Sequence, residues 1–164
     1  MFKVIDNFLD KKIFKEIQKG ILEDNQFPWY FSNYIDYHGE KGFDKTQFGH
    51  VFYQKHSPNS SYIKLLDPII KKLNCISLIK IKVNNTYYTD KIREGTYHVD
   101  NEYKGTTTAV YYLNTNNGYT KFKKNKNKIN SVENRMVIFD SNIQHLGTTT
   151  TNAKRRVVLN FNYF

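Results

Sequence analysis

The residues after Cys75 show the feature that most constrains the fold: short runs of β-branched and aromatic residues separated by Asn, Gly, Asp and Lys. This pattern is typical of an antiparallel sandwich or barrel. It predicts short strands near residues 77–84, 95–100, 106–113, 119–122, 128–132, 135–139, 143–149 and 155–163. No internal repeat and no linker interrupts the chain, so we expect a single domain over residues 1–164.

Helices are predicted only before this β-rich part. Asp10 can N-cap a helix over about 10–23, in which apolar residues recur at helical spacing. Ser60 or Ser61 can cap a second helix, and Pro68 either bends this helix or lies near its first turn. We therefore expect a mainly β chain with its helices near the N-terminus.

The segment between the two predicted helices contains one predicted loop and one predicted strand. Aromatic residues crowd around Pro28, over Phe27–Tyr37. The polar stretch His38–Lys45 contains two glycines, which indicates a surface loop. Gln47–Gln54 follows this loop and is predicted to be a strand.

The composition excludes several classes of protein. Of the 164 residues, 16% are aromatic, so the chain is not largely disordered. No apolar run approaches the ~20 residues of a membrane span, and Met1–Asp6 lacks the apolar core of a signal peptide. We therefore expect a cytoplasmic protein without membrane contact, in the host cytoplasm if the source is viral. The single Cys75 cannot form an internal disulfide or a multi-thiolate metal site, so any metal must depend mainly on His and carboxylate ligands.

The net charge of +10, from 25 Lys and Arg against 15 Asp and Glu, is compatible with anionic partners such as nucleic acid. It can equally reflect an AT-rich genome, whose codons favour Lys, Asn, Ile and Tyr. The densest cluster, Lys121–Lys128, is interleaved mostly with Asn rather than with the aromatic residues that stack on bases. We interpret it as a solvated hairpin turn, and nucleic-acid binding is not favoured.

The segment around His98 can bring metal ligands together. If Thr96–Asp100 is extended, alternation places the side chains of His98 and Asp100 on one face. His145 lies in another predicted strand and could supply a third ligand. Two His and one carboxylate on one octahedral face are the ligands of non-haem Fe(II) oxygenases. The alternative is an ordinary hydrogen-bonded His and Asp pair at the surface.

The last predicted strand begins with two arginines, Arg155 and Arg156. Alternation sends them to opposite faces, so one guanidinium points into the fold if both faces are covered. A guanidinium in that place needs an anion, and a carboxylate matches its planar fork. Alternation alone does not decide which of the two arginines points inward, or whether both flank an edge strand.

Together these motifs resemble the Fe(II)- and 2-oxoglutarate-dependent dioxygenases, specifically the prolyl hydroxylase-like branch found in animals, bacteria and viruses. The resemblance covers residues 76–164 and includes the order of the His-x-Asp pair, the distal His and the following Arg. It extends to the successive core strands, through the segments His98–Asn101, Val110–Asn114, Gly118–Phe122, Arg135–Phe139 and Arg156–Phe161. The chain departs from the family where Asn117–Gly118 stands in place of a Gly-Gly pair, which leaves the geometry of that hairpin open.

The resemblance implies a double-stranded β-helix, a cupin-like jelly-roll of two antiparallel sheets. Residues 76–164 would form its core, and residues 1–75 would support it, with the N-terminal helices packed outside the larger sheet. It further implies that Fe(II) is held by His98, Asp100 and His145 and that the distal carboxylate of 2-oxoglutarate is bound by Arg156. The Tyr112 hydroxyl would support the same carboxylate, and Thr120 would line the cosubstrate pocket. Tyr112 could instead be a core aromatic residue, and Thr120 a plain strand residue.

The implied activity is a dioxygenase that uses Fe(II), 2-oxoglutarate and O2, with ascorbate as a candidate reductant. It would hydroxylate a prolyl or other amino-acid or protein substrate and release succinate and CO2. The alternatives are an oxidative demethylase of alkylated nucleic-acid bases and a non-catalytic jelly-roll that binds a peptide or glycan. Selectivity would depend on loops near the iron, at residues 38–45, 90–94 and 101–105.

The size and composition of the chain are similar to those of compact oxygenases of marine phages and bacteria. The substrate and the oligomeric state stay open.

Overall fold

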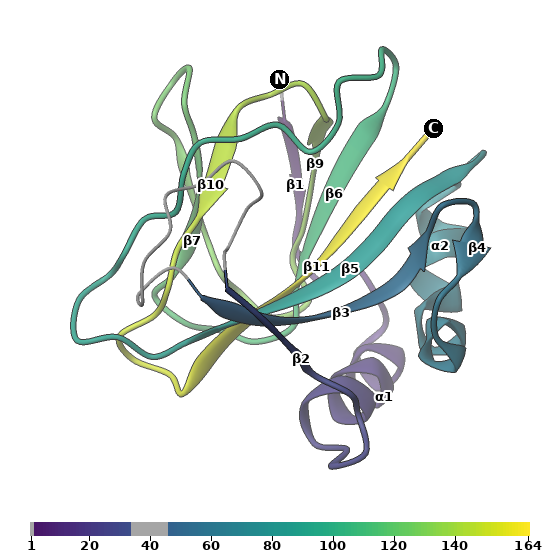
Figure 1. Ribbon diagram of the computed structural model, residues 1–164, viewed down its shortest axis with the longest axis horizontal. Helices are drawn as coiled ribbons and strands as arrows, with labels where there is room; N and C mark the ends of the chain where they lie inside the picture. The colour runs from purple at the N-terminus through teal and green to yellow at the C-terminus, as the bar shows by residue number, and fades with distance from the viewer. Residues whose placement is uncertain (1, 34–45) are drawn as a thin grey trace.

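Two antiparallel β-sheets face each other in the computed structural model, which describes residues 2–33 and 46–164 (Figure 1). The larger sheet has the strand order β1 (Phe2–Ile5), β9 (Met136–Asp140), β6 (Thr107–Tyr112), β11 (Arg155–Tyr163), β5 (Leu78–Tyr87), β3 (Gln47–Gln54) and β2 (Tyr30–Ser32), and β4 (Ser57–Pro58) pairs with β3. The smaller sheet consists of β10 (His145–Gly147), β7 (Tyr119–Phe122) and β8 (Lys128–Asn130). This arrangement is the predicted double-stranded β-helix.

The helices cover the face of the larger sheet that points away from β7 and β10 (Figure 1). Helix α1 (Lys11–Leu22) begins after Asp10, whose carboxylate accepts a hydrogen bond from the Lys12 backbone at 2.8 Å. The prediction for this helix is therefore confirmed to within one residue at each end. The buried residues of α1 are Phe14, Ile17 and Ile21, and they belong to one hydrophobic cluster with residues of the larger sheet.

The second predicted helix consists of two parts. Ser60 caps a 3-10 helix, η1 (Ser61–Leu66), and α2 (Asp67–Leu73) continues directly from it. Pro68 lies in the first turn of α2, where its missing N–H group leaves no helical hydrogen bond unmade. The proline therefore starts a new helix instead of bending a longer one.

The larger sheet has an apolar core on each face. Towards the helices, the outer residues of β5, β6 and β11 join one cluster, which includes Ile81, Tyr111 and Leu159. Towards the smaller sheet, a second cluster includes Tyr112 and Phe122. Residues of β11 alternate between the two faces, so that Val157 packs towards the helices and Val158 towards the smaller sheet. The side chains between the sheets therefore come from alternate positions of the central strands.

The prediction of a continuous strand over 95–100 is wrong. This segment pairs only through isolated bridges, Glu94 with Thr148 and His98 with His145. Between these bridges one chain advances by four residues and the other by three, so a regular ladder cannot continue. For the same reason the partner strand β10 is shorter than the predicted 143–149.

Other predicted strands agree more closely with the structure. Those at 119–122 and 155–163 have the observed bounds, and β5 continues to Tyr87, beyond the predicted end at residue 84. The short strands β1, β2 and β4 were not predicted, because two to four residues carry too little periodicity. The predicted loop His38–Lys45 lies outside the described residues. No helix in the described ranges has the length and apolar character of a membrane span.

Candidate active site

Three side chains with metal-ligating atoms converge at one end of the space between the sheets. They are His98, Asp100 and His145, and their ligand atoms all lie within 4.8 Å of one another. Each histidine Nε2 is 3.7 Å from one oxygen of the Asp100 carboxylate. These distances are too long for hydrogen bonds and leave room for a cation among the three groups.

The backbone orients both imidazole rings. Nδ1 of His98 lies 3.0 Å from the carbonyl oxygen of Thr96, and Nδ1 of His145 lies 3.0 Å from that of Ile143. A carbonyl oxygen can only accept, so each Nδ1 carries the proton and each Nε2 lone pair points towards the carboxylate. Burial lowers the pKa of His145, although Asp100 partly opposes this effect. The neutral form that ligates metals is thereby favoured.

A hydrogen-bond chain holds the carboxylate of Asp100. The hydroxyl of Thr108 donates to Asp100 Oδ2 at 2.9 Å and accepts a bond from the amide of Asn162 at 3.0 Å. Ser141 Oγ lies 3.0 Å from the same hydroxyl. Sequence analysis did not identify these supporting residues, because they come from β6, β11 and the turn after β9 and meet only in the folded chain.

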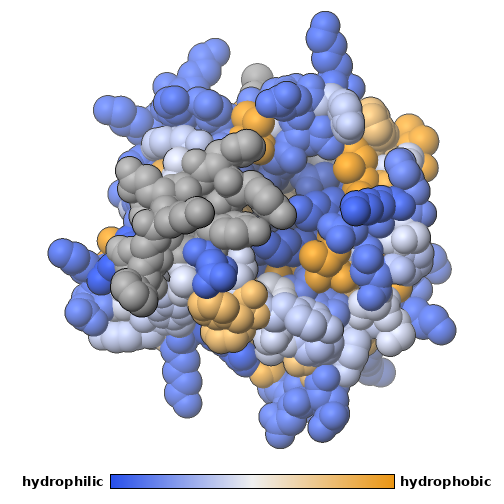
Figure 2. Space-filling model, in the orientation of Figure 1, coloured by the Kyte–Doolittle hydropathy of each residue, from blue (hydrophilic) through white to orange (hydrophobic). Residues whose placement is uncertain are grey.

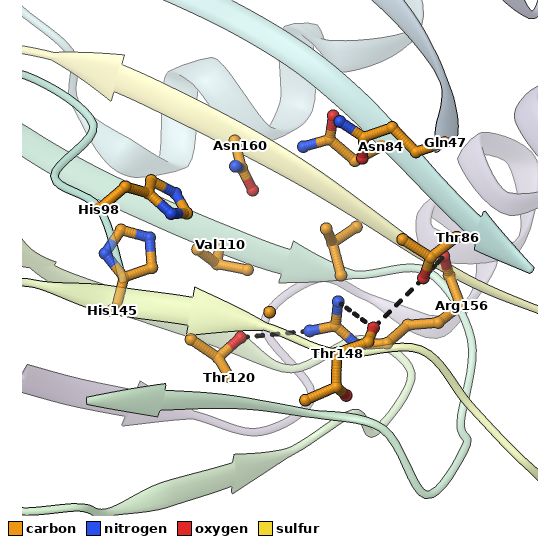
Figure 3. A pocket seen from close by; sticks show the side chains of 12 residues that line it. Gln47, Asn84, Thr86, His98, Val110, Thr120, His145, Thr148, Arg156 and Asn160 are labelled. Atoms are coloured by element: carbon orange, nitrogen blue, oxygen red, sulfur yellow. Dashed lines mark hydrogen bonds between the residues drawn. The ribbon is translucent and has the colours of Figure 1, made fainter. Parts of the chain in front are cut away.

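A cavity of ≈ 70 Å³ extends from the histidines to Arg156 (Figure 3). His98 and His145 lie at one end, and Arg156 lies at the other, close to Thr148 and Thr120 (Figure 3). The remaining lining residues are Gln47, Asn84, Thr86, Val110, Gly147, Val158 and Asn160. The cavity therefore joins a set of metal-ligating groups to a buried cation.

Arg156 is only 4% exposed, and its guanidinium lies in the interior. It donates to the Ser131 hydroxyl at 2.8 Å, to the Thr120 hydroxyl at 3.2 Å and to the Thr148 carbonyl at 3.5 Å. Within residues 2–33 and 46–164, no carboxylate lies within ion-pair distance of it. Burial lowers its pKa, since the charged form loses hydration. A buried positive charge without a counter-charge is costly, and a bound anion would offset that cost.

Arg155 points the other way. Its guanidinium donates to the carbonyl oxygen of Leu22 at the end of α1, on the helix side of the larger sheet. The register of β11 is therefore the one in which Arg156 faces the cavity.

Thr120 and Tyr112 lie beside Arg156. Thr120 lines the cavity, and its hydroxyl accepts hydrogen bonds from Arg156 and, at 2.8 Å, from the Tyr112 hydroxyl. The Tyr112 ring is fully buried behind Thr120, with the Arg156 guanidinium carbon 5.6 Å from its centroid. The structure thus places Thr120 in the cavity wall and Tyr112 outside the lining, and the contact of either residue with a cosubstrate stays a prediction.

Amide side chains line the wall of the cavity on β5 and β11, and sequence analysis did not identify them. Asn84 and Asn160 both reach the cavity (Figure 3). In each, the side-chain oxygen is buried without a hydrogen-bond partner among the described residues. The alternation of β5 and β11 could have indicated this wall, because Asn84 and Asn160 share faces with Thr86 and Arg156.

Comparison with known proteins agrees with this geometry. The sequence model of the 2OG-Fe(II) oxygenase superfamily matches residues 84–164, which include the three clustered ligands and Arg156. A search of curated proteins finds no match.

Solved structures share the fold over almost the whole chain. The viral collagen prolyl hydroxylase of Paramecium Bursaria Chlorella virus-1 is 14% identical with a TM-score of 0.62, and the match covers 98% of this chain and 94% of that one. A prolyl hydroxylase from Trichoplax adhaerens, in complex with a hypoxia inducible factor peptide, is 18% identical with a TM-score of 0.69, over 99% and 83% of the chains. A non-heme alpha ketoglutarate dependent epimerase of nogalamycin biosynthesis is 12% identical with a TM-score of 0.71, over 99% and 77%.

The residues present also fit the cofactors of this superfamily. Two imidazoles and a carboxylate form the donor set that non-haem Fe(II) prefers, with coordination positions left for other ligands. The buried Arg156 lacks a carboxylate partner among the described residues, and the far carboxylate of 2-oxoglutarate would supply one. The chain therefore belongs to the 2OG-Fe(II) oxygenase superfamily and is a dioxygenase dependent on Fe(II), 2-oxoglutarate and O2.

Proposed function

We propose that His98, Asp100 and His145 hold Fe(II), that Arg156 binds the distal carboxylate of 2-oxoglutarate, and that the enzyme hydroxylates a prolyl or other amino-acid substrate. One observation carries the assignment of these residues: a cavity connects the three converging ligands to a buried guanidinium without an acidic partner among the described residues. The two ends of this cavity match the two ends of the cosubstrate.

Each protein group has a defined task. The histidines present Nε2 because their Nδ1 protons are directed to backbone carbonyls, and Thr108 holds Asp100 in place. Arg156 and Thr120 orient the far end of the cosubstrate from β11 and β7. When bound, Fe(II) and 2-oxoglutarate supply the oxidising chemistry, in which O2 provides one oxygen atom to the succinate that is formed with CO2 and the other to the C–H bond of the substrate.

The prolyl or amino-acid substrate is supported by the similar structures. Two of them are described as prolyl hydroxylases, one with a peptide bound. The epimerase shows that the same fold also serves another reaction outcome, so the product must be identified directly. The experiment must therefore separate cosubstrate turnover from substrate oxidation.

Replacing His145 tests the metal assignment. We expect His145→Ala to reduce Fe(II) affinity in an anaerobic titration by at least about tenfold and to abolish succinate release, because one of three protein ligands is lost. His56→Asn is the matched control, since His56 is exposed and its positive φ suits Asn. Undiminished iron affinity in His145→Ala would show that His145 is not a ligand. Succinate release by the wild type, coupled to a product heavier by one oxygen atom, would identify a hydroxylase.

A further inference from the structure

Lys82 lies on the same face of β5 as the residues of this strand that line the cavity. Lys82, Asn84 and Thr86 alternate along the strand and therefore share one face. Asn84 and Thr86 line the proposed cosubstrate cavity, and Lys82 follows at about 7 Å, two residues along the strand. Its cross-strand partner on β11 is Asn160, which also lines that cavity. Lys82 itself borders a second cavity of ≈ 360 Å³, lined by Tyr30, Phe31, Ser32, Gly49, His50, Val51, Asn59 and Lys82.

The stem of Lys82 lies across β3 at a glycine. A Cβ atom at Gly49 would come within 2.9 Å of Lys82 Cε and 3.6 Å of Nζ, and within 3.2 Å of the Val83 carbonyl oxygen. Gly49 pairs with Asn84 on one side and with Tyr30 of β2 on the other. Because Gly49 has no side chain, the Lys82 side chain can pass over β3 towards β2.

The ammonium of Lys82 lacks a partner in the part of the chain that the structure describes. It makes no hydrogen bond or ion pair there, although most of the side chain is buried. Burial and, to a smaller extent, the neighbouring charge of Lys80 lower the pKa of Lys82 to about 8, with Asp100 acting in the opposite direction. The group therefore remains mainly charged near pH 7.

The surroundings of this ammonium suit a small organic anion. Tyr30 is 64% exposed and borders the same cavity, so its ring offers an apolar contact beside the charge. Figure 2 shows separate hydrophobic patches among mostly hydrophilic side chains on the face of the molecule that is seen in Figure 1. Besides histidines, the described lining of the two cavities contains two cations, Arg156 and Lys82. A nucleic-acid backbone needs a row of cations, whereas a single ammonium matches a single carboxylate.

We propose that Lys82 binds a carboxylate of the substrate, which is a free amino acid or a peptide with a free carboxylate near the reacting C–H bond. This inference rests on the proposed function, in which Arg156 is committed to the cosubstrate. Lys82 holds the substrate across β5, between the β2 cavity and the metal ligands. The carboxylate offsets the cost of the buried ammonium, as 2-oxoglutarate does at Arg156.

Matched pairs of compounds test the proposal. Succinate release by the Fe(II)- and 2-oxoglutarate-loaded wild type is measured with a pool of common amino acids and with the pool of their amides. A second pair consists of short peptides with free and with amidated C-termini, and a third arm is N-methylated single-stranded DNA. We expect stimulation by at least one carboxylate pool and none by its amide counterpart. The free amino-acid and peptide arms distinguish the two sources of carboxylate.

Two lysine variants then locate the effect. Lys82→Met keeps the length of the stem and removes the charge, and Lys80→Met removes the exposed lysine next on the same face of β5. For the stimulating compound, we expect Lys82→Met to raise KM at least about tenfold and Lys80→Met to change it less than about twofold. Because Lys82 is buried without a described partner, the unfolding temperature of Lys82→Met should not fall.

Specific outcomes overturn the inference. It is wrong if neither carboxylate pool stimulates turnover, if the amides act equally well, if only the DNA stimulates, or if Lys82→Met leaves KM unchanged. The proposed function is judged separately, by succinate release from the wild type without any added substrate and by anaerobic binding of 2-oxoglutarate. If the wild type neither releases succinate without added substrate nor binds 2-oxoglutarate under anaerobic conditions, the proposed function itself is contradicted.

Discussion

Two neighbouring arginines show how much one residue of register decides in this protein. Arg155 donates to the end of α1, whereas Arg156 points between the sheets and donates to Thr120 and Ser131. Both are at the start of β11 and differ only in the face that alternation assigns to them. The residue-scale consequence is that the two charges have separable effects on ligand binding and on stability.

Arg156→Met should therefore reduce 2-oxoglutarate affinity more than about tenfold, because removing one partner of a buried charge pair costs ~2–5 kcal/mol. The unfolding temperature of the unliganded protein should not fall, since the substitution also removes a buried charge that lacks a described counter-charge. Calorimetric titration with Mn(II) in place of Fe(II) measures the affinity. Arg155→Met is the control, and a larger loss of affinity in that variant would contradict the assignment.

His50 is a buried histidine outside the proposed active site. It is 4% exposed and packs against Phe27 and Phe52, with Nδ1 2.9 Å from the Pro28 carbonyl and Nε2 without a partner among the described residues. Burial lowers the pKa of His50 below its ordinary value of 6.5, and the Pro28 contact only partly opposes this. The unfolded chain therefore binds this proton more readily than the folded one.

Below pH 6.5, protonation of His50 in the unfolded chain lowers the free energy of unfolding. The contribution of neutral His50 to stability is therefore fully present above pH 6.5 and is lost as the pH falls through the pKa of His50 in the folded protein. We expect the free energy of unfolding to decrease between pH 7.5 and pH 5.5, and to decrease less in His50→Phe. Urea denaturation of metal-free protein at several pH values measures this slope. His56→Asn, at an exposed position, should retain the wild-type slope, and an equal slope in His50→Phe would disprove the assignment.

At the scale of elements, the connection between β6 and β7 determines where Arg156 can lie. A Cβ atom at Gly118 would come within 2.6 Å of Arg156 Cδ and 2.7 Å of the Thr149 carbonyl oxygen. Asn117 fixes this connection, because its side chain accepts from the Thr151 backbone and donates to the Thr151 hydroxyl. The departure from a Gly-Gly pair is thus accommodated, since glycine is needed at position 118 for close approach and Asn at 117 makes hydrogen bonds.

Gly118→Ala should destabilise the protein by roughly 1–3 kcal/mol and also weaken 2-oxoglutarate binding, because the new methyl group overlaps both the backbone and the Arg156 stem. Gly147→Ala is a graded control, in which the new Cβ would lie 3.3 Å from a terminal nitrogen of Arg156 that can move. Thermal denaturation and calorimetric titration of both variants measure the two effects. Equal losses in the two variants would argue against the backbone overlap at Gly118.

At the scale of the whole molecule, the N-terminal segment is joined to the jelly-roll by paired strands and by side-chain hydrogen bonds, among them those of one buried asparagine. Strand β1 pairs with β9, and β3 pairs with β5, so residues before position 75 extend the larger sheet. Asn134 connects the two parts: its Oδ1 accepts from the Leu9 backbone and the Tyr111 hydroxyl, and its amide donates to the Leu9 carbonyl. Asn134 also has a φ of 60°, a conformation that Asn tolerates better than most residues.

Asn134→Ala should lower the free energy of unfolding by about 3 kcal/mol, since three buried hydrogen bonds are lost and Ala is strained at this φ. Asn134→Gly loses the same bonds without the strain and should be less destabilised by about 1 kcal/mol. A single urea transition, seen by both fluorescence and circular dichroism, is expected for each variant because the segments form one core. Separate transitions would show that residues 1–75 unfold independently.

At the scale of the whole molecule, the positive charge is densest in the Lys121–Lys128 cluster, and contacts with other residues partly neutralise it there. Lys121 forms an ion pair with Glu94 at 2.8 Å, and the Lys128 ammonium lies 4.4 Å from the ring centroid of Tyr119. The partner Glu94 comes from a distant part of the sequence, so the charge run Lys121–Lys128 overstates the local positive potential. This contact agrees with the prediction that the Lys121–Lys128 cluster is not a nucleic-acid site.

The sequence alone determined the features that depend on neighbouring residues. Asp10 and the helical spacing after it predicted α1, and the alternation of the last segment predicted the bounds of β11. Alternation also placed His98 and Asp100 on one side, and they converge even though 95–100 is not a strand, because an extended backbone alternates with or without a continuous ladder.

Only the tertiary structure decided the features that depend on contacts between distant residues. The orientation of Arg156 over that of Arg155 follows from the end of α1 on one face and Thr120 on the other. The irregular pairing around His98 depends on its match with β10, and the path of Lys82 depends on Gly49 in another strand. Periodicity reports which residues share a face, whereas the pairing of strands decides what that face meets.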